Sequence, residues 1–186
     1  IVGTPVENAM QYIGMNVTKP PFDNLKLRQA VAYAIPYQKI MDAVMYGRAK
    51  PLFGGSADKY SSADWPCATP YTTDIAKAKA LMAEAGFPNG LETSLSFDLG
   101  LAGINEPLCI LVQESLAQIG IKTTIEKIPG ANWRNELLKK SMPLITNTFG
   151  GWLNYPEYFY FWAYHSQDAV FNTMSYKNPD VDKLIE

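Results

Sequence analysis

Hydrophobic and polar positions recur along the chain with two spacings, and these predict helices and strands in turn. Between residues 74 and 86 apolar side chains repeat every three or four positions, which is typical of an amphipathic helix. Thr73 or Asp74 is the expected N-cap, and Gly86 is the expected left-handed stop. The apolar stripe of this helix comprises Ile75, Ala78, Leu81, Met82 and Ala85.

A strand, a helix and a second strand follow. Alternate residues from 91 to 97 and from 121 to 125 suit a strand, and residues 105–119 between them carry a helical stripe that Gly120 ends. Two strands joined by a crossover helix pair in parallel, with a right-handed connection, in nearly all folds. The predicted fold class is therefore α/β, a mixed sheet flanked by helices.

The first part of the chain continues the same alternation. Residues 10–16 predict a strand and residues 25–34 a helix, and Pro36 suits the first turn of a second helix that ends near Gly47. The stretch 48–71 is rich in Gly, Ser and Pro and is long for a connection without structure, so we expect a packed functional loop. We find no convincing domain boundary and expect residues 1–186 to form a single lobe.

An aromatic run follows the last predicted strand, 143–149. Nine of the sixteen residues from Phe149 to Tyr164 are aromatic, and each buried ring is worth about 1.5–3 kcal/mol, so either a core or a ligand must cover them. The run starts at the carboxyl end of a strand, where α/β sheets usually bind ligands. Gly150 and Gly151 allow the backbone there to approach a ligand closely, although composition alone favours a plain turn.

Composition narrows the function. A net charge of −2 and scattered basic residues exclude a nucleic-acid surface, and no apolar run reaches the roughly 20 residues of a membrane helix. The sequence starts at Ile1 without an initiator Met, so we expect Ile1 to be a processing boundary. Cys67 and Cys109 form no spacing motif, so a disulfide and two independent thiols both stay open, and we expect no metal and no cofactor.

Catalytic chemistry is weakly supported. His165 is the single histidine, and its neighbour Ser166 is too close in sequence for a working dyad. We expect His165 to be a hydrogen-bonded residue at the end of the aromatic helix. Glu106 and Glu114 are expected to be solvated carboxylates on the polar face of one helix. The sequence therefore favours a protein that is not an enzyme.

Several segments, in order, resemble the peptide-type (family 5) extracytoplasmic solute-binding proteins of ABC importers. The likeness covers some 175 residues, and the order and spacing of its motifs make it specific. The matching segments are 12–16 before Pro20-Pro21-Phe22-Asp23, LRQAVAYAI at 27–35, Gly47-Arg48-Ala49, DIAKAKALMAEAGFPNG at 74–90, Gln118-Ile119-Gly120-Ile121-Lys122, Gly151-Trp152, Asn172-Thr173, 176–179 and Asp182.

The resemblance implies a partial molecule with a ligand site. Such proteins have two lobes hinged around a solute, and this chain looks like most of the second, C-terminal lobe, without the first lobe and the final returning segment. The implied partners are a small-molecule solute and, through the parent protein, ABC permease subunits in the periplasm or elsewhere outside the cytoplasm. The implied ligand contacts are Phe149, Gly150, Gly151, Trp152, Asn154, Tyr155 and, at a position facing the cleft in some relatives, Trp133. The helix 158–164 is expected to be buried all round in the core of the lobe.

One departure from the family pattern concerns the solute. Peptide-binding relatives carry an aspartate two or three residues past the Gly-Trp tryptophan, whereas this chain has Asn154, which cannot neutralise an α-ammonium. Glu157 could substitute if the loop is re-aimed. A peptide and a neutral, hydroxyl-rich oligosaccharide therefore both stay open as solutes. A small α/β enzyme and a protein-interaction domain using the aromatic run are the alternatives from other classes.

Overall fold

A computed structural model describes residues 9–49, 71–150, 153, 156–167 and 171–186, and the elements alternate as the sequence predicts. Besides α-helices, a π-helical turn (η1) follows α2, and a 3₁₀ turn (η2) precedes α4. In chain order they are β1 (Ala9–Met15), α1 (Leu25–Ala34), α2 (Tyr37–Lys39), η1 (Ile40–Val44), α3 (Ile75–Glu84), β2 (Leu91–Asp98), η2 (Leu99–Leu101), α4 (Ala102–Ala117), β3 (Ile121–Ile128), α5 (Gly130–Lys139), β4 (Leu144–Gly150), α6 (Pro156–Tyr164) and α7 (Pro179–Ile185).

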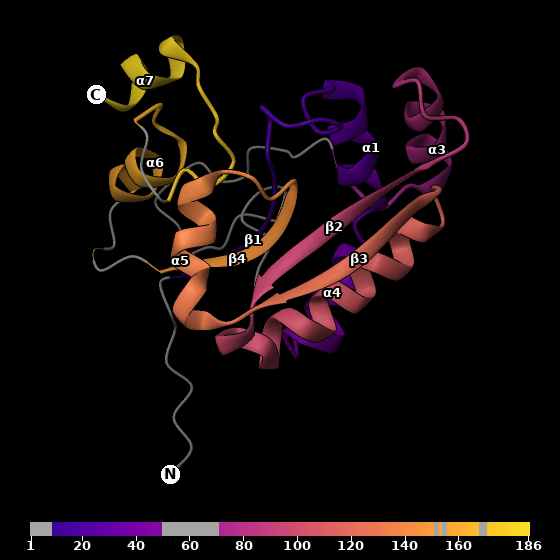
Figure 1. Cartoon of the computed structure of the whole chain (residues 1–186), viewed down its shortest axis with the longest axis horizontal. Helices are drawn as coiled ribbons and strands as arrows, with labels where there is room; N and C mark the ends of the chain where they lie inside the picture. The colour runs from indigo at the N-terminus through magenta and orange to yellow at the C-terminus, as the bar shows by residue number, and fades with distance from the viewer. Residues whose placement is uncertain (1–8, 50–70, 151–152, 154–155, 168–170) are drawn as a thin grey trace, which may run out of the picture. The chain divides into compact units, whose positions relative to one another are not determined.

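The strands form one mixed sheet in the order β1-β4-β2-β3 (Figure 1). β1 runs antiparallel to β4, from Ala9 opposite Gly150 to Met15 opposite Leu144. β4 pairs in parallel with β2, where Leu95 lies opposite Leu144. The predicted fold class is confirmed, and β4 is an inner strand with a neighbour on each side.

β2 and β3 start side by side and run in the same direction, as their arrows in Figure 1 show. Two side-chain contacts join residues thirty positions apart and one backbone hydrogen bond joins residues twenty-nine apart, which is the near-constant offset of a parallel pair. The predicted strand–helix–strand unit is therefore confirmed. The contacts are Leu91 N–H to Gly120 O at 3.1 Å, Lys122 Nζ to Glu92 Oε1 at 3.3 Å and Ser96 Oγ to Glu126 Oε2 at 2.9 Å.

The chain divides into two compact units, and the expectation of a single lobe stays a prediction. The first unit comprises residues 1–23, 94–100 and 126–186, and the second comprises residues 24–93 and 101–125.

Within the second unit, polar side chains join the helices around an apolar core. Asn24 caps α1 through its Oδ1 and donates from Nδ2 to Ala85 O at the end of α3. Ser115 of α4 donates its hydroxyl to Ala34 O at the end of α1. These contacts satisfy orphan carbonyls at helix ends, where no intrahelical donor is available.

Helix boundaries agree with the sequence in most places. Asp74 is the N-cap of α3, because its Oδ1 accepts from Lys77 N, and Gly86 has the expected left-handed φ of +89°. The helix after Pro36 differs: after one α-helical turn it widens into η1, where Met45 N–H donates to Ile40 O at 3.0 Å. Loop residues 50–70, including Cys67, lie outside the described residues.

The crossover helix α4 begins earlier than the stripe from 105 suggested. It starts at Ala102, and Pro107 lies inside the helix instead of at its first turn. Pro107 cannot donate to the carbonyl of residue 103, yet the surrounding bonds keep the helix intact.

Candidate functional site

The carboxyl end of β4 is the first part of the predicted ligand site, and it is open. Phe149 is buried, with 5% of its surface exposed, and one residue further Gly150 has open space where a Cβ would stand. Leu153 is exposed. The predicted contacts Gly151, Trp152, Asn154 and Tyr155 lie outside the described residues.

The hydroxyl group of Tyr12, on β1, anchors the neighbouring strand β4. Tyr12 OH lies 3.0 Å from Thr173 Oγ1 and accepts a hydrogen bond from Asn147 Nδ2 at 3.1 Å. Burial raises the pKa of Tyr12, although both hydrogen bonds act in the opposite direction. β1, β4 and the segment after α6 therefore meet at one phenol.

The opposite face of the β1–β4 pair carries neutral polar side chains. Gln11 donates from Nε2 to Thr146 Oγ1 at 2.8 Å, and its Oε1 accepts from the Thr148 hydroxyl. Thr146 is fully buried, so these bonds satisfy groups that water cannot reach. The bonds hold the two strands in register up to the end of β4.

Trp133, the weaker of the predicted contacts, lies in the apolar core of the first unit. It belongs to α5, is 7% exposed, and packs with Leu137 of the same helix and with Ile145 of β4. Partly buried residues complete the cluster: Tyr12, Ile128, Met142 and Met174.

Five aromatic rings gather around the end of β4; we refer to them as the Phe149 cluster. Phe149 stacks on Tyr158 at 5.9 Å between ring centroids, with an interplanar angle of 12°. It meets Phe159 edge-on and Phe171 at a tilt, both at 5.3 Å. Trp162 completes the cluster by contacting Tyr158 and Phe171. These offset and edge-to-face contacts are the favourable arrangements for aromatic pairs.

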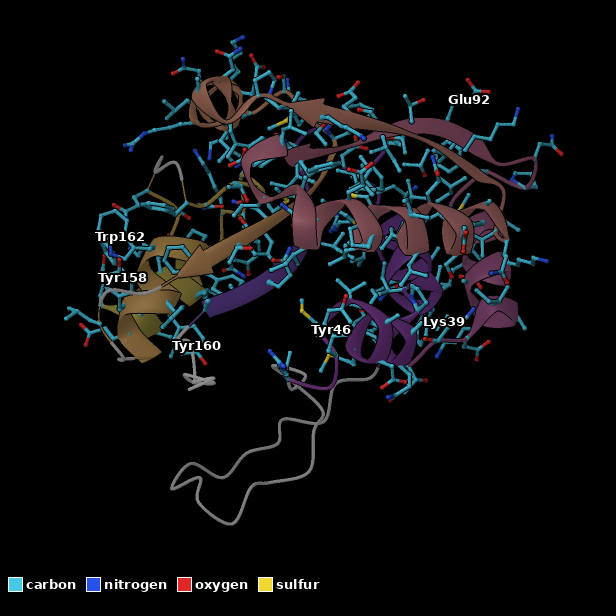
Figure 2. All side chains as sticks on the ribbon, turned by 90° about the horizontal axis from the view of Figure 1, so that it is seen from below. Lys39, Tyr46, Glu92, Tyr158, Tyr160 and Trp162 are labelled. Atoms are coloured by element: carbon cyan, nitrogen blue, oxygen red, sulfur yellow. The ribbon has the colours of Figure 1, made fainter. Side chains whose placement is uncertain are left out.

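The expectation that helix 158–164 is buried all round is wrong for this chain. Between Tyr158 and Tyr164 no residue of α6 is fully buried, and Tyr160 is 42% exposed. The aromatic residues occupy more than one side of the helix, so β4 can cover only part of them. Figure 2 shows Tyr158 and Trp162 on one side of α6 and Tyr160 on another.

Glu157, the alternative carboxylate, belongs to a different part of the first unit. It is exposed and lines a shallow cavity of about 430 Å³ between α6 and α7, together with Tyr160, Leu184, Ile185 and Glu186. In the described part of the chain, Glu157 therefore lines the same cavity as a second carboxylate, that of Glu186, and does not lie among the rings of the Phe149 cluster.

His165 has the structural role predicted for it. Its Nε2 lies 3.4 Å from Glu186 Oε1, and its Nδ1 accepts from Gln167 N at 3.2 Å, directly after α6. Glu114 is exposed, as expected for a solvated carboxylate on α4, whereas Glu106 is half-buried. Among the described residues, no group of three or more His, Cys, Asp or Glu side chains is placed to hold a metal ion.

Sequence reasoning missed the network of Tyr12. Tyr12 and its partner Thr173 lie in two segments of the family resemblance, 12–16 and 172–173, but the two residues are 161 positions apart. Asn172, next to Thr173, adds two hydrogen bonds beside this network, because its Nδ2 donates to His165 O and to Tyr176 O, each at 2.8 Å. Pairing across such a distance requires the tertiary fold, and a polar motif alone does not reveal it.

Comparison with known proteins identifies the family. The sequence profile of the bacterial extracellular solute-binding proteins, family 5, middle region, matches residues 3–171. The chain belongs to this family. None of the described helices is both long and apolar enough to cross a membrane.

Individual relatives agree with this assignment. The glutathione-binding protein GsiB of Shigella flexneri serotype 5b is 30% identical over 183 residues, which are 94% of this chain and 35% of that protein. The structure of a dipeptide-binding protein from Pseudoalteromonas sp. SM9913 in complex with Met-Leu is 26% identical, with a TM-score of 0.79, and the match covers 95% of this chain and 36% of that one. The periplasmic binding protein DppA of Helicobacter pylori, in complex with the peptide STSA, shares the fold with a TM-score of 0.82 at 22% identity, over 95% of this chain and 35% of that one. This chain thus spans about a third of the length of these relatives.

Proposed function

We propose that the chain is part of the solute-binding component of an ABC importer. The protein that contains it would capture a small solute between two lobes, outside the cytoplasm, and deliver it to a membrane permease. The family match over residues 3–171 is the observation that carries this proposal. A ligand that bridges both lobes favours the closed state by its differential affinity, and closure then excludes water from the polar contacts.

The proposed contact region is the segment that follows β4. Phe149 and Gly150 begin it, and Gly151, Trp152, Asn154 and Tyr155 continue it along the chain. The open space at Gly150 supports this proposal, because a solute could approach the backbone there. With 7% of its surface exposed, Trp133 would contribute mainly by holding Ile145 of β4.

The solute is proposed to be a peptide or a peptide-like molecule, as named for the glutathione-binding relative and for the relative in complex with Met-Leu. Asn154 favours a second candidate, a neutral oligosaccharide, because an amide pairs well with hydroxyl groups and poorly with an ammonium. The proposed location is the periplasm or another extracytoplasmic compartment.

Mass spectrometry of the solute retained by the full-length protein tests the proposal. The protein would be purified from its own host, denatured, and its small molecules identified and then rebound by calorimetry. Recovery of a short peptide or a sugar that rebinds supports solute capture, and the identity of that molecule decides between the two candidates. A full-length protein that retains nothing and binds no member of a peptide and oligosaccharide panel would contradict the proposal.

A further inference from the structure

Most of the Phe149 cluster is accessible. Of its five rings only Phe149 is buried; Tyr158, Phe159 and Trp162 are half-buried, and Phe171 is 41% exposed. Tyr158 and Trp162 project from one side of α6 in Figure 2, as their spacing of four residues requires. The cluster therefore presents ring surface that no other described residue covers completely.

The position of the cluster connects it with the proposed ligand site. Phe149, at its centre, is the last buried residue of β4, and Gly150 next to it faces open space. β4 runs parallel to β2, so its carboxyl end lies at the edge where parallel sheets bind their ligands. The exposed rings thus surround the strand end from which the proposed contact segment continues along the chain.

The surface is aromatic and uncharged, and the Tyr158 hydroxyl and the Trp162 ring N–H are the polar groups of its side chains. The five rings carry no charge at neutral pH, and Glu157, the only charged residue of α6, lines the separate cavity toward α7. Ring faces and edges bind apolar groups by burial and by aromatic contact, and they offer no charged partner for an ion pair.

From this arrangement we infer that the Phe149 cluster is a subsite for an aromatic or aliphatic group of the solute. The inference rests on the proposed function and narrows its substrate class: the solute bears an apolar group, and a molecule that is polar throughout is a poor ligand. The rings of Tyr158, Trp162 and Phe171 would contact that group.

The experiment measures the preference of the full-length protein for a phenyl group. The probes are pairs that differ in one such group: Ala-Phe-Ala against Ala-Ala-Ala, the same pair N-acetylated, and phenyl against methyl β-glucoside. Binding of each is measured by calorimetry, alongside mass spectrometry of the retained solute. We expect at least one pair to bind, with the phenyl member preferred by about tenfold or more, the lower limit for burying one ring.

Two variants assign the preference to the cluster. Phe171→Ala should remove most of the preference, and Trp162→Leu should reduce it while keeping an apolar side chain. Tyr160→Ala is the matched control, since Tyr160 is 42% exposed but contacts Tyr164 outside the cluster, and it should leave the preference unchanged.

Each other outcome overturns the inference in a distinguishable way. Equal binding within every pair, or a retained solute without an apolar group, contradicts the subsite but leaves solute capture standing. If Phe171→Ala lowers the melting temperature and leaves the preference for a phenyl group unchanged, the cluster is part of the core of the parent protein. If the full-length protein is a dimer and Phe171→Ala dissociates it, the cluster is a contact between two copies. Absence of any bound solute contradicts the proposed function itself, and the subsite with it.

Discussion

Tyr12 joins three segments through one hydroxyl group. We expect Tyr12→Phe to lower the free energy of unfolding by about 1–3 kcal/mol, because the buried amide of Asn147 and the hydroxyl of Thr173 each lose a partner. Urea unfolding monitored by circular dichroism measures the change. Tyr160→Phe, which removes a hydroxyl from a residue that is 42% exposed, should stay within about 0.5 kcal/mol of the parent chain. A Tyr12→Phe protein as stable as this control would contradict the structural role of the network.

The thiol of Cys109 is buried. Burial, with a smaller effect from Glu106, raises its pKa to about 12 from the reference value of 9.0. Since the folded state holds this proton more tightly than the unfolded state, the thiol costs no stability below pH 9 and reduces stability as the pH rises from 9 toward 12. We therefore expect the urea midpoint of a Cys67→Ser protein to fall more steeply over this range than that of the Cys67→Ser, Cys109→Ala protein. Parallel pH profiles would show that Cys109 does not titrate as its burial requires.

The same burial predicts that Cys109 is unreactive in the folded chain. In the Cys67→Ser background, a thiol reagent such as Ellman's reagent should label Cys109 slowly at pH 8 and rapidly in denaturing urea, because the thiolate is the reactive species. Rapid labelling without denaturant would contradict the buried position.

At the scale of elements, the starts of β2 and β3 meet at two glycines. A Cβ on Gly90 would lie 2.1 Å from Gly120 O, and Gly90 has a φ of +83°. Gly86 has a similar φ of +89°, but a Cβ there meets nothing within 4 Å. Gly86→Ala should therefore cost about 1 kcal/mol for its backbone conformation alone.

Gly90→Ala should cost at least about 2 kcal/mol more than Gly86→Ala, because a backbone contact must also be relieved. Urea unfolding of the two variants compares them directly. Equal costs would mean that the strands do not approach as closely as the structure places them.

Local signals predicted all four strands and several of the helices, whereas α5 and α7 were not among the predicted elements. Asp74 and Gly86 marked the two ends of α3, and the alternation from Leu91 to Phe97 marked β2. Both faces of β2 are covered here, however, because Ser96 is as fully buried as its neighbour Leu95, so alternation indicated the strand without indicating an exposed face.

The candidate site was less predictable, for a physical reason. Phe149 and Gly150 follow from the strand and from the family resemblance, but the rings that surround Phe149 come from α6 and from Phe171. Their mutual contacts depend on tertiary packing. The aromatic content of α6 indicated a core, whereas the structure leaves most of its rings half-exposed.

At the scale of the whole molecule, the proposed capture between two lobes predicts that this chain alone binds the solute more weakly than the full-length protein does. If the solute is held equally by two lobes, a dissociation constant of about 1 μM, or about −8.2 kcal/mol, would weaken to about 1 mM with half of the binding energy. Calorimetry with the solute recovered from the full-length protein would compare the two. Equal affinities would contradict capture between lobes.

The constant offset of thirty residues between β2 and β3 has a consequence for genetic change. Gly90 with Gly120, Glu92 with Lys122 and Ser96 with Glu126 all depend on the same count of residues. Deleting a single codon from either strand would mispair every partner beyond it at once, whereas a point substitution disturbs one pair. In a library of in-frame deletions, the codons of these two strands should therefore be among those whose loss the protein tolerates least.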